Sequence, residues 1–496
     1  MSGLMLGLFV AILAGTVVSN ALPRIVAELR GSQSIFAWIV TTELLAMTAT
    51  VPLWGKLADL YSRKLLIQAS LGLFVAGSLI AGFSQNVEML IVSRVVQGLG
   101  AGGVTALATI VMAAMIPPRE LGRYSGLFGA VFGVGTVAGP LIGGVLVDTS
   151  WLGWRWCFFV GIPFSLAAIW LLQRTLHLPV VRKEDTKIDF LGAFLIVSGV
   201  STLLIWSSLA GDKFGWWSGW TAGLVALGVL LLVAAVRVEA TAHDPIVPLS
   251  IFRNRTVALT VVASALVGVA MFGSTVFLSQ YFQLSLGRTP TQAGLLGLPV
   301  ILGMLISSTV AGQLITKYGR WKAYLVSGGV VMVGGMLLLS TITAGSTVFM
   351  LSADMFVLGV GVGLLMQNLV LVAQNDVPAR DLGATTSALT FFRSLGGAIG
   401  VSALGAVLAS KVSSLAAEKF GPMGGSGEAR VPDLAVLPPE VRAVIADIYA
   451  TATSELFLVG APFAALALLA VLFIKEKPLK EQSGDDRLAA EMAAGH

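Results

Sequence analysis

GKLADLYSRK at residues 55–64 and GQLITKYGR at residues 312–320 are two versions of one short pattern, separated by 257 positions. A second pattern, PPRELG at 117–122, returns as PARDLG at 378–383, separated by 261 positions. Blocks that return in the same order at nearly one spacing indicate an internal duplication. The spacing contains an even number of apolar segments, so the two copies have the same orientation. Parallel repeats of this kind are typical of membrane transporters, which bind substrate between the two halves.

The composition around these blocks is that of a membrane protein. Of the 496 residues, 56% are hydrophobic and 11% are charged, whereas soluble domains carry about 25% charged residues. So few charges cannot cover so much apolar surface in water, which excludes a soluble enzyme, a disordered regulator and a fibrous protein. We expect an all-α polytopic membrane protein with fourteen transmembrane helices, because about 20 apolar residues cross a bilayer as a helix. The apolar runs are roughly 3–22, 37–57, 65–84, 88–110, 124–147, 156–176, 190–210, 220–237, 256–286, 291–315, 323–343, 347–375, 384–409 and 454–475.

The basic residues predict the orientation of these spans. Cytoplasmic loops of membrane proteins carry an excess of Lys and Arg. Cytoplasmic termini would place 20 of the 31 basic residues inside and nine outside, with Arg94 and Arg393 within spans. We therefore expect both termini in the cytoplasm. The net charge of +5 belongs to short loops between apolar runs and does not indicate a nucleic-acid partner.

The repeat predicts how the chain is divided. Spans one to six recur as spans nine to fourteen, and the two spans between them have no counterpart, which indicates an inserted pair. The predicted parts are an N-terminal six-helix bundle (1–176), a linker with two extra helices (177–255), a C-terminal six-helix bundle (256–475, including an outer loop at 410–453) and a cytoplasmic tail (476–496).

Three motifs resemble those of a known family. Residues 55–64 match the pattern G-x-L-A-D-R-x-G-R-K except at Leu60 and Ser62. Arg94, Gln97, Gly98 and Gly100 match R-x-x-Q-G-x-G, and residues 135–144 match G-x-x-x-G-P-x-x-G-G completely. On these motifs the chain resembles the major facilitator superfamily, and within it the fourteen-helix drug:proton antiporter family.

This resemblance implies a fold and a function. The fold would be two pseudo-symmetric six-helix bundles plus two inserted linker helices. The protein would be a monomer in the cytoplasmic membrane of a bacterium, surrounded by lipid bilayer. It would export hydrophobic or amphipathic small molecules, including antibiotics, by alternating access, with the proton gradient as its energy source and no cofactor. A lipid exporter of the same fold and an uncoupled facilitator are the alternatives.

The first motif predicts a gate on the cytoplasmic side. Gly55 allows two helices to approach closely, and Asp59 has the position to cap the next helix or to pair with Arg63 or Lys64. Such pairs across a cytoplasmic seam lock one face shut and open when the halves rock. The other interpretation is ordinary positive-inside topology plus a helix cap.

The third motif predicts a tightly packed, bent helix. Its residues are Gly135, Gly139, Pro140, Gly143 and Gly144. Glycines four residues apart line one helix face and allow close packing, and Pro140 removes a backbone hydrogen bond and bends the helix. We interpret this face as a leak-tight seam between the halves, with ordinary glycine packing as the alternative. The second half has Val401 in place of Pro140.

Charges within spans are costly and mark function by default. Glu43, Arg94 and Asp354 each lie about 9–10 Å below the outer end of a span, and Asp354 is one position from the repeat counterpart of Arg94. The resembling family has an aspartate in the first span where this chain has Ala14. Our hypothesis is that the proton-carrying carboxylate is instead Glu43, opposed by Arg94. The alternatives are a structural Glu43, protonated or paired with arginine, and an Asp354 near the lipid headgroups.

Other polar residues within spans suggest a substrate cavity. Arg393 would attract an anionic substrate group or would bind backbone carbonyls of a neighbouring helix. Gln280, Gln283, Gln367 and Asn368 suit an apolar cavity with few polar groups, and each would equally serve as a helix-to-helix hydrogen bond.

Several kinds of chemistry are not supported by the residues. A single cysteine and three scattered histidines build no disulfide and no metal site. The sequence contains no phosphate-binding loop, and no nucleophile–base pair lies within the spans. The residues therefore do not indicate an enzyme. In the outer loop, the apolar periodicity after Pro438 predicts an amphipathic helix that extends the last span or lies on the membrane surface.

Overall fold

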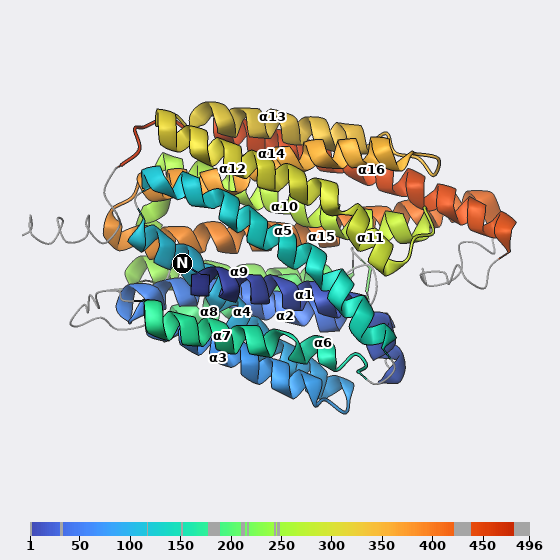
Figure 1. The fold of residues 1–496 in the computed structure, drawn as a ribbon, viewed down its shortest axis with the longest axis horizontal. Helices are drawn as coiled ribbons and strands as arrows, with labels where there is room; N and C mark the ends of the chain where they lie inside the picture. The colour runs from blue at the N-terminus through green and yellow to red at the C-terminus, as the bar shows by residue number, and fades with distance from the viewer. Residues whose placement is uncertain are drawn as a thin grey trace, which may run out of the picture.

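The computed structural model describes residues 2–29, 33–116, 118–149, 152–176, 189–209, 214–215, 218–242, 245, 249–420 and 438–480. The long elements in these residues are α-helices that run along the long axis of the molecule (Figure 1). The first half contains α1 (Ser2–Glu28), α2 (Gln33–Leu60), α3 (Arg63–Gly82), α4 (Val87–Met115), α5 (Pro118–Asp148), α6 (Trp156–Phe159) and α7 (Gly161–Thr175). The middle contains α8 (Phe190–Leu209), α9 (Gly219–Thr241) and the 3-10 turn η1 (Leu249–Arg253). The second half contains α10 (Arg255–Leu284), α11 (Pro290–Leu296), α12 (Leu298–Tyr318), α13 (Lys322–Leu339), α14 (Val348–Asn375), the turn η2 (Ala379–Asp381), α15 (Leu382–Phe420) and α16 (Pro439–Leu472).

Each predicted apolar run coincides with one helix or with one of the broken pairs α6–α7 and α11–α12. Within the described residues, ten helices are long and apolar enough to cross a membrane. The predicted all-α polytopic fold is therefore confirmed, whereas the count of fourteen spans stays a prediction.

The described parts of the outer loop predicted at 410–453 are helical at 410–420 and 439–453. Helix α15 continues to Phe420 and α16 begins at Pro439, so the predicted amphipathic helix extends the last span. The two helices run beyond the rest of the bundle, and α16 protrudes on the right of Figure 1. Two ion pairs join them there, Lys411 Nζ to Glu455 Oε1 at 2.8 Å and Lys419 Nζ to Asp447 Oδ2 at 2.6 Å. A prediction from apolar runs alone makes these two helices too short. The helices continue beyond the apolar runs because charged pairs join them there.

The two halves meet along two helix pairs. Helix α5 packs on α12, and α2 packs on α15. Phe391 of α15 is buried in the apolar core of the first half, together with residues of α1 to α4. The inserted helix α8 packs on α9 and also on both α2 and α15. The inserted pair therefore covers one of the two seams between the halves.

The internal repeat is visible in the helix contacts. A Cβ atom added at Gly98 of α4 would collide with the carbonyl oxygen of Glu43 in α2. In the second half, a Cβ at Gly359 of α14 would collide in the same way with the carbonyl oxygen of Val300 in α12. Two further contacts repeat. Gly100 packs on Phe74 in the first half, and Gly361 packs on Met332 in the second. Likewise Gly102 packs on Met47, and Gly363 packs on Met304. The halves therefore share one backbone packing, and these contacts identify corresponding residues.

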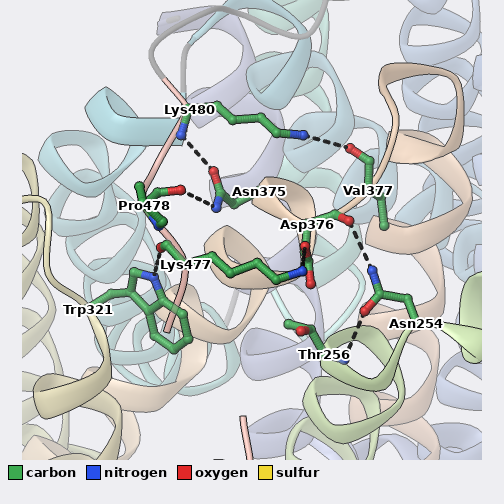
Figure 2. Close-up of polar contacts among 9 residues, drawn as sticks. All are labelled: Asn254, Thr256, Trp321, Asn375, Asp376, Val377, Lys477, Pro478 and Lys480. Atoms are coloured by element: carbon green, nitrogen blue, oxygen red, sulfur yellow. Dashed lines mark hydrogen bonds and ion pairs between the residues drawn. The ribbon is translucent and has the colours of Figure 1, made fainter. Parts of the chain in front are cut away.

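The chain beyond α16 forms a strap, defined here as residues 473–480, across one end of the second bundle (Figure 2). This is the end where α2 connects to α3, which the basic residues predict to be cytoplasmic. The strap contacts the start of α13, where Glu476 Oε1 accepts from the backbone N–H of Trp321 at 3.0 Å. It also contacts the end of α14. There, Asn375 Nδ2 donates to the carbonyl of Pro478 at 3.0 Å, and Lys477 Nζ lies 2.6 Å from Asp376 Oδ1. The carbonyl of Asp376 in turn accepts from Asn254 Nδ2, at 3.0 Å, just before α10. The strap therefore joins helix ends that are far apart in the sequence.

The strap should loosen in acid. Burial raises the pKa of Asp376, but its polar neighbours, first among them Lys477 with a hydrogen bond to Oδ1 and a positive charge, outweigh burial and hold this pKa below its ordinary value. A carboxylate with a lowered pKa stabilises the folded state above its ordinary pKa, and that stability is lost as pH falls through the lowered value. Asp376→Asn should therefore speed hydrogen exchange of the strap at neutral pH by about fivefold, since partly exposed pairs contribute roughly 1 kcal/mol or less.

The control for this prediction is Asp447→Asn, which removes a carboxylate paired with Lys419 on the outer helices. This change should leave exchange of the strap unaltered. Unchanged exchange in Asp376→Asn would contradict the importance of the ion pair.

Candidate functional site

Close packing of α4 on α2 brings Arg94 to Glu43. Only glycine at position 98 allows this approach, because any Cβ there would meet the backbone of Glu43. One helical turn earlier on α4, the guanidinium of Arg94 forms an ion pair with the carboxylate of Glu43. The two residues are buried, with 1% of Arg94 and 8% of Glu43 exposed. The motif glycine therefore places a charged pair inside the first bundle.

Further hydrogen bonds hold the guanidinium in place. Arg94 Nε donates to the carbonyl of Ile39 at 3.1 Å, and Arg94 Nη1 donates to Gln97 Oε1 at 2.7 Å. Gln97 Nε2 then donates to Ser78 Oγ on α3 at 2.9 Å. We call Glu43, Arg94, Gln97 and Ser78 the polar group. Sequence reasoning named the first two and quoted Gln97 as a motif residue, but it missed Ser78, whose only signal is a small polar residue in an apolar span.

The second half contains no polar group at the corresponding place. Position 300 corresponds to Glu43 through the shared glycine contacts, and the offset of 261 pairs Arg94 with Met355 and Gln97 with Leu358. Gly335 packs on Leu358 in the same way that Gly77 packs on Gln97, so Gly335 corresponds to Gly77. The next residues, Met336 and Ser78, therefore also correspond. The four counterparts are Val300, Met336, Leu358 and Met355. The same backbone packing therefore forms with apolar side chains, and the fold does not require the polar group.

Asp354 lies apart from the polar group. It is on α14, corresponds to Ser93, and is 6% exposed. Its Oδ2 has no hydrogen-bond partner among the described residues, and no described contact joins it to Glu43 or Arg94. A role for Asp354 in proton coupling stays a prediction.

Position 14, where the resembling family has an aspartate, is occupied by apolar packing. Ala14 is 6% exposed and belongs to a small core with Val10, Phe74 and Ala101. A carboxylate here would lie inside the first bundle, between α1, α3 and α4. Glu43 lies in the same bundle, on α2, which packs on α4.

The structure describes part of the predicted gate. Gly55 faces the second half, where an added Cβ would collide with Ser387 and approach the carbonyl of Gly383. Arg63 Nε donates to the carbonyl of Ala58 at 3.4 Å. Lys64 Nζ donates to the carbonyl of Gln173 at the end of α7, at 2.8 Å. The side chain of Asp59 lies outside the described residues.

Lys64 holds its own bundle together. Its counterpart Lys322 donates to the carbonyl of Leu472 at the end of α16, at 3.2 Å. Each half thus joins the start of its third helix to the end of its sixth. The predicted pairing of Lys64 across a gate is replaced by this contact within the first half, because its long side chain reaches a free helix-end carbonyl.

Replacing Gly55 by leucine should prevent full closure of the α2–α15 seam. Overpacking costs about 1–3 kcal/mol, which would shift the ratio of closed to open states by about 5- to 150-fold. Solvent accessibility of a cysteine introduced at Ser387 measures the effect, after Cys157 is replaced. The matched control is Gly72→Leu on α3, where an added Cβ meets nothing within 4 Å. Equal accessibility in both variants would contradict this contact.

The prediction for the antiporter-motif glycines is wrong in one respect. Gly135 packs on Ile12, Gly139 on Thr16 and Gly143 on the carbonyl of Val17, all in α1. They therefore pack within the first bundle and do not form the seam between the halves. The seam lies on another face of α5, where Gly133 meets Ile301 of α12. Periodicity identifies a small-residue face but does not identify the helix it contacts.

The remaining motif residues add little to the site. Gly144 is half-buried on α5. Pro140 lies within the continuous helix α5, and its side chain lies outside the described residues.

The residues predicted to line a cavity divide into two kinds. Asn368 is 1% exposed and donates to the carbonyl of Leu364 in its own helix at 2.7 Å, so it does not line a cavity. Gln283 Nε2 donates to Ser279 Oγ, also in its own helix, at 3.2 Å. Gln280, Gln367 and Arg393 are half-buried. These last three remain available to a substrate.

Comparison with known proteins identifies the family and the fold of the chain. The model of the Major Facilitator Superfamily matches residues 4–401. An uncharacterized MFS-type transporter of Mycobacterium tuberculosis is 36% identical over 490 residues, which cover 98% of this chain and 70% of that protein. The multidrug transporter protein MdtP of Bacillus subtilis is 32% identical over 524 residues, which cover 99% and 96%. The crystal structure of the human organic anion transporter MFSD10 has the same fold, with a TM-score of 0.59 at 14% identity, covering 93% of this chain and 98% of that one.

Proposed function

Because the chain belongs to the major facilitator superfamily, and is therefore a transporter rather than an enzyme, we propose that it is a proton-coupled exporter of hydrophobic or amphipathic small molecules. We place it in the fourteen-helix drug:proton antiporter branch, as a monomer in a bacterial cytoplasmic membrane with both termini in the cytoplasm. Relatives named as multidrug transporters at about a third identity support export. The proton gradient would supply the energy.

The polar group is the observation that supports proton coupling. The second half packs its helices in the same way with Val300, Met355, Leu358 and Met336, so the fold gains nothing from a buried ion pair. Buried ion pairs are no more stabilising than well-packed apolar residues. A buried carboxylate that the fold does not need is therefore best explained by its chemistry, which is the binding and release of a proton.

The proposed cycle uses the two seams. With Glu43 ionised, Arg94 holds α2 and α4 together, and the contact of Gly55 with Ser387 keeps the predicted cytoplasmic end closed. Protonation removes the charge of Glu43 and weakens its hold on Arg94, so α2 is free to move relative to α15. Substrate binding between the halves and proton binding at Glu43 would then favour opposite orientations, which is the condition for antiport.

Proton–substrate exchange in inside-out vesicles tests this proposal. A pH gradient is imposed and followed by dye quenching while amphipathic cations and anions are added. The wild-type protein should collapse the gradient in the presence of substrate, and Glu43→Gln should abolish the collapse. The control is Glu28→Gln, which changes a half-exposed carboxylate paired with Arg155 and should retain exchange. Collapse that survives in Glu43→Gln would move the proton to another residue, with Asp354 next; no collapse with any compound would favour uncoupled transport or lipid export.

A further inference from the structure

Arg393 lies well inside the apolar run that predicts the thirteenth span. It lies eleven residues into α15 from Leu382, or about 16 Å along the helix at about 1.5 Å per residue. The hydrocarbon core of a bilayer is about 30 Å thick, so the Cα atom of Arg393 is close to its centre. Ionisable residues at this depth mark substrate or ion pathways by default.

The protein does not satisfy this guanidinium. Among the described residues, Arg393 forms no hydrogen bond and no ion pair, and it is half-buried. Arg94 shows how the same chain pairs a buried arginine, with an ion pair to Glu43, hydrogen bonds to Ile39 and Gln97, and 1% exposure. The expected alternative for Arg393, a bond to backbone carbonyls of a neighbouring helix, is therefore not realised.

The helix packing does not require arginine here. Gly396 and Gly400 of α15 pack on α10 as Gly135 and Gly139 of α5 pack on α1, which confirms the offset of 261 for these helices. At this offset, position 393 corresponds to Phe132. The other copy of the repeat thus has an apolar residue at the same place. As with the polar group, comparison of the two repeats indicates that the fold does not require the charged residue, which is present in one half alone.

Helix α15 borders both halves around Arg393. It packs on α2 of the first half, where Phe391 is buried in the apolar core, and on α10 of the second half. The backbone carbonyl of Arg393 lies directly against Gly268 of α10. An exported molecule that binds between the halves at this level of α15 would meet a positive charge that has no partner among the described residues.

We infer that Arg393 binds the negatively charged group of an amphipathic anion, so that the exported molecules carry a carboxylate, sulfonate or phosphate on an apolar body. This inference rests on the proposed export function and specifies its substrate. The guanidinium donates hydrogen bonds to the anionic group, and the apolar side chains of the neighbouring helices contact the apolar body. Coupling to one inward proton then moves two charges per cycle for a monovalent anion, so export should depend on membrane potential.

Two probes that differ only in their charged group test this site, naphthalene-2-sulfonate and trimethyl(2-naphthyl)ammonium. Equilibrium binding of each labelled probe is measured on the purified full chain in lipid nanodiscs, without a proton gradient. The wild-type protein should prefer the sulfonate, and Arg393→Met should lose this preference by about tenfold or more, as expected for a charged hydrogen bond. Arg393→Lys, which keeps the charge, should retain part of it. Arg155→Met, which removes an outer arginine paired with Glu28, should change nothing.

Each outcome decides the inference. Equal binding of the two probes, preference for the ammonium, or unchanged preference in Arg393→Met would overturn it. If Arg393→Met does not fold, Arg393→Lys and Arg393→Gln are compared instead. A preference for the sulfonate that is retained in Arg393→Lys and lost in Arg393→Gln would support the inference, and equal preference in the two variants would overturn it. Because binding needs no gradient, a charge preference that depends on Arg393 would stand even if the vesicle experiment showed no proton exchange.

Discussion

Replacing Arg94 by methionine should lower the free energy of unfolding by about 3–5 kcal/mol, because it leaves the Glu43 carboxylate buried without its partner. Gln97 Oε1 also loses its donor. The change should appear as a large fall in the midpoint of denaturation of the purified protein in detergent. It should also abolish proton-coupled transport.

Exchanging the whole polar group should separate stability from coupling. The variant Ser78→Met, Glu43→Val, Arg94→Met and Gln97→Leu installs the four apolar residues that the second half uses at the same places. Most of the stability lost in Arg94→Met should return, because volume-conserving apolar cores replace buried ion pairs with little cost. Proton exchange should stay absent. If the fourfold variant were as unstable as Arg94→Met, the polar group would be structural and the proposed function would lose its main support.

Valine at Gly98 should strongly destabilise the first bundle while it leaves every charge in place. Its side chain would meet the carbonyl of Glu43, a backbone atom that cannot turn away. Overpacking of a core typically costs about 1–3 kcal/mol and more where the backbone must shift. We expect Gly98→Val to lower the unfolding midpoint and to break the ion pair between Glu43 and Arg94 by moving α2 away from α4.

The internal repeat supplies the matched variants for Gly98→Val. Gly359→Val introduces the same collision with the carbonyl of Val300 and should destabilise the protein similarly, but the polar group should remain intact. Gly15→Val is the neutral control, since a Cβ there meets nothing within 4 Å. If Gly98→Val and Gly15→Val melted alike, α2 and α4 would not be packed as closely as described.

Part of the site was predictable because its signal is local. A charged residue in an apolar run is visible without any knowledge of its neighbours, and this identified Glu43, Arg94, Asp354 and Arg393. The pairing of Glu43 with Arg94 was among the alternatives, and the structure contains this ion pair. Similar depths in the membrane also placed Asp354 with these two residues, but depth leaves the direction around the helix axis undetermined, and no contact among the described residues joins Asp354 to them.

Contacts between helices were the main source of error. The glycines of α5 were expected at the seam between the halves and instead pack on α1, and Lys64 was expected at a gate and instead bonds to the end of α7. The strap over the second bundle, which links Glu476 to Trp321 and Lys477 to Asp376, was not predicted at all. Its residues looked like part of a charged tail.

The sequence by itself determined the class of the fold, the position of the apolar helices and the duplication, because apolar run length and repeated motifs are properties of the chain that need no partner. The tertiary structure alone decided which face of each helix meets which neighbour. That choice depends on side chains from distant segments filling one space, as Gly98 and Glu43 do. It also revealed that the second half reproduces the packing around Glu43 and Arg94 with apolar residues, since the counterparts of Glu43 and Ser78 are recognised by the contacts that their helices make.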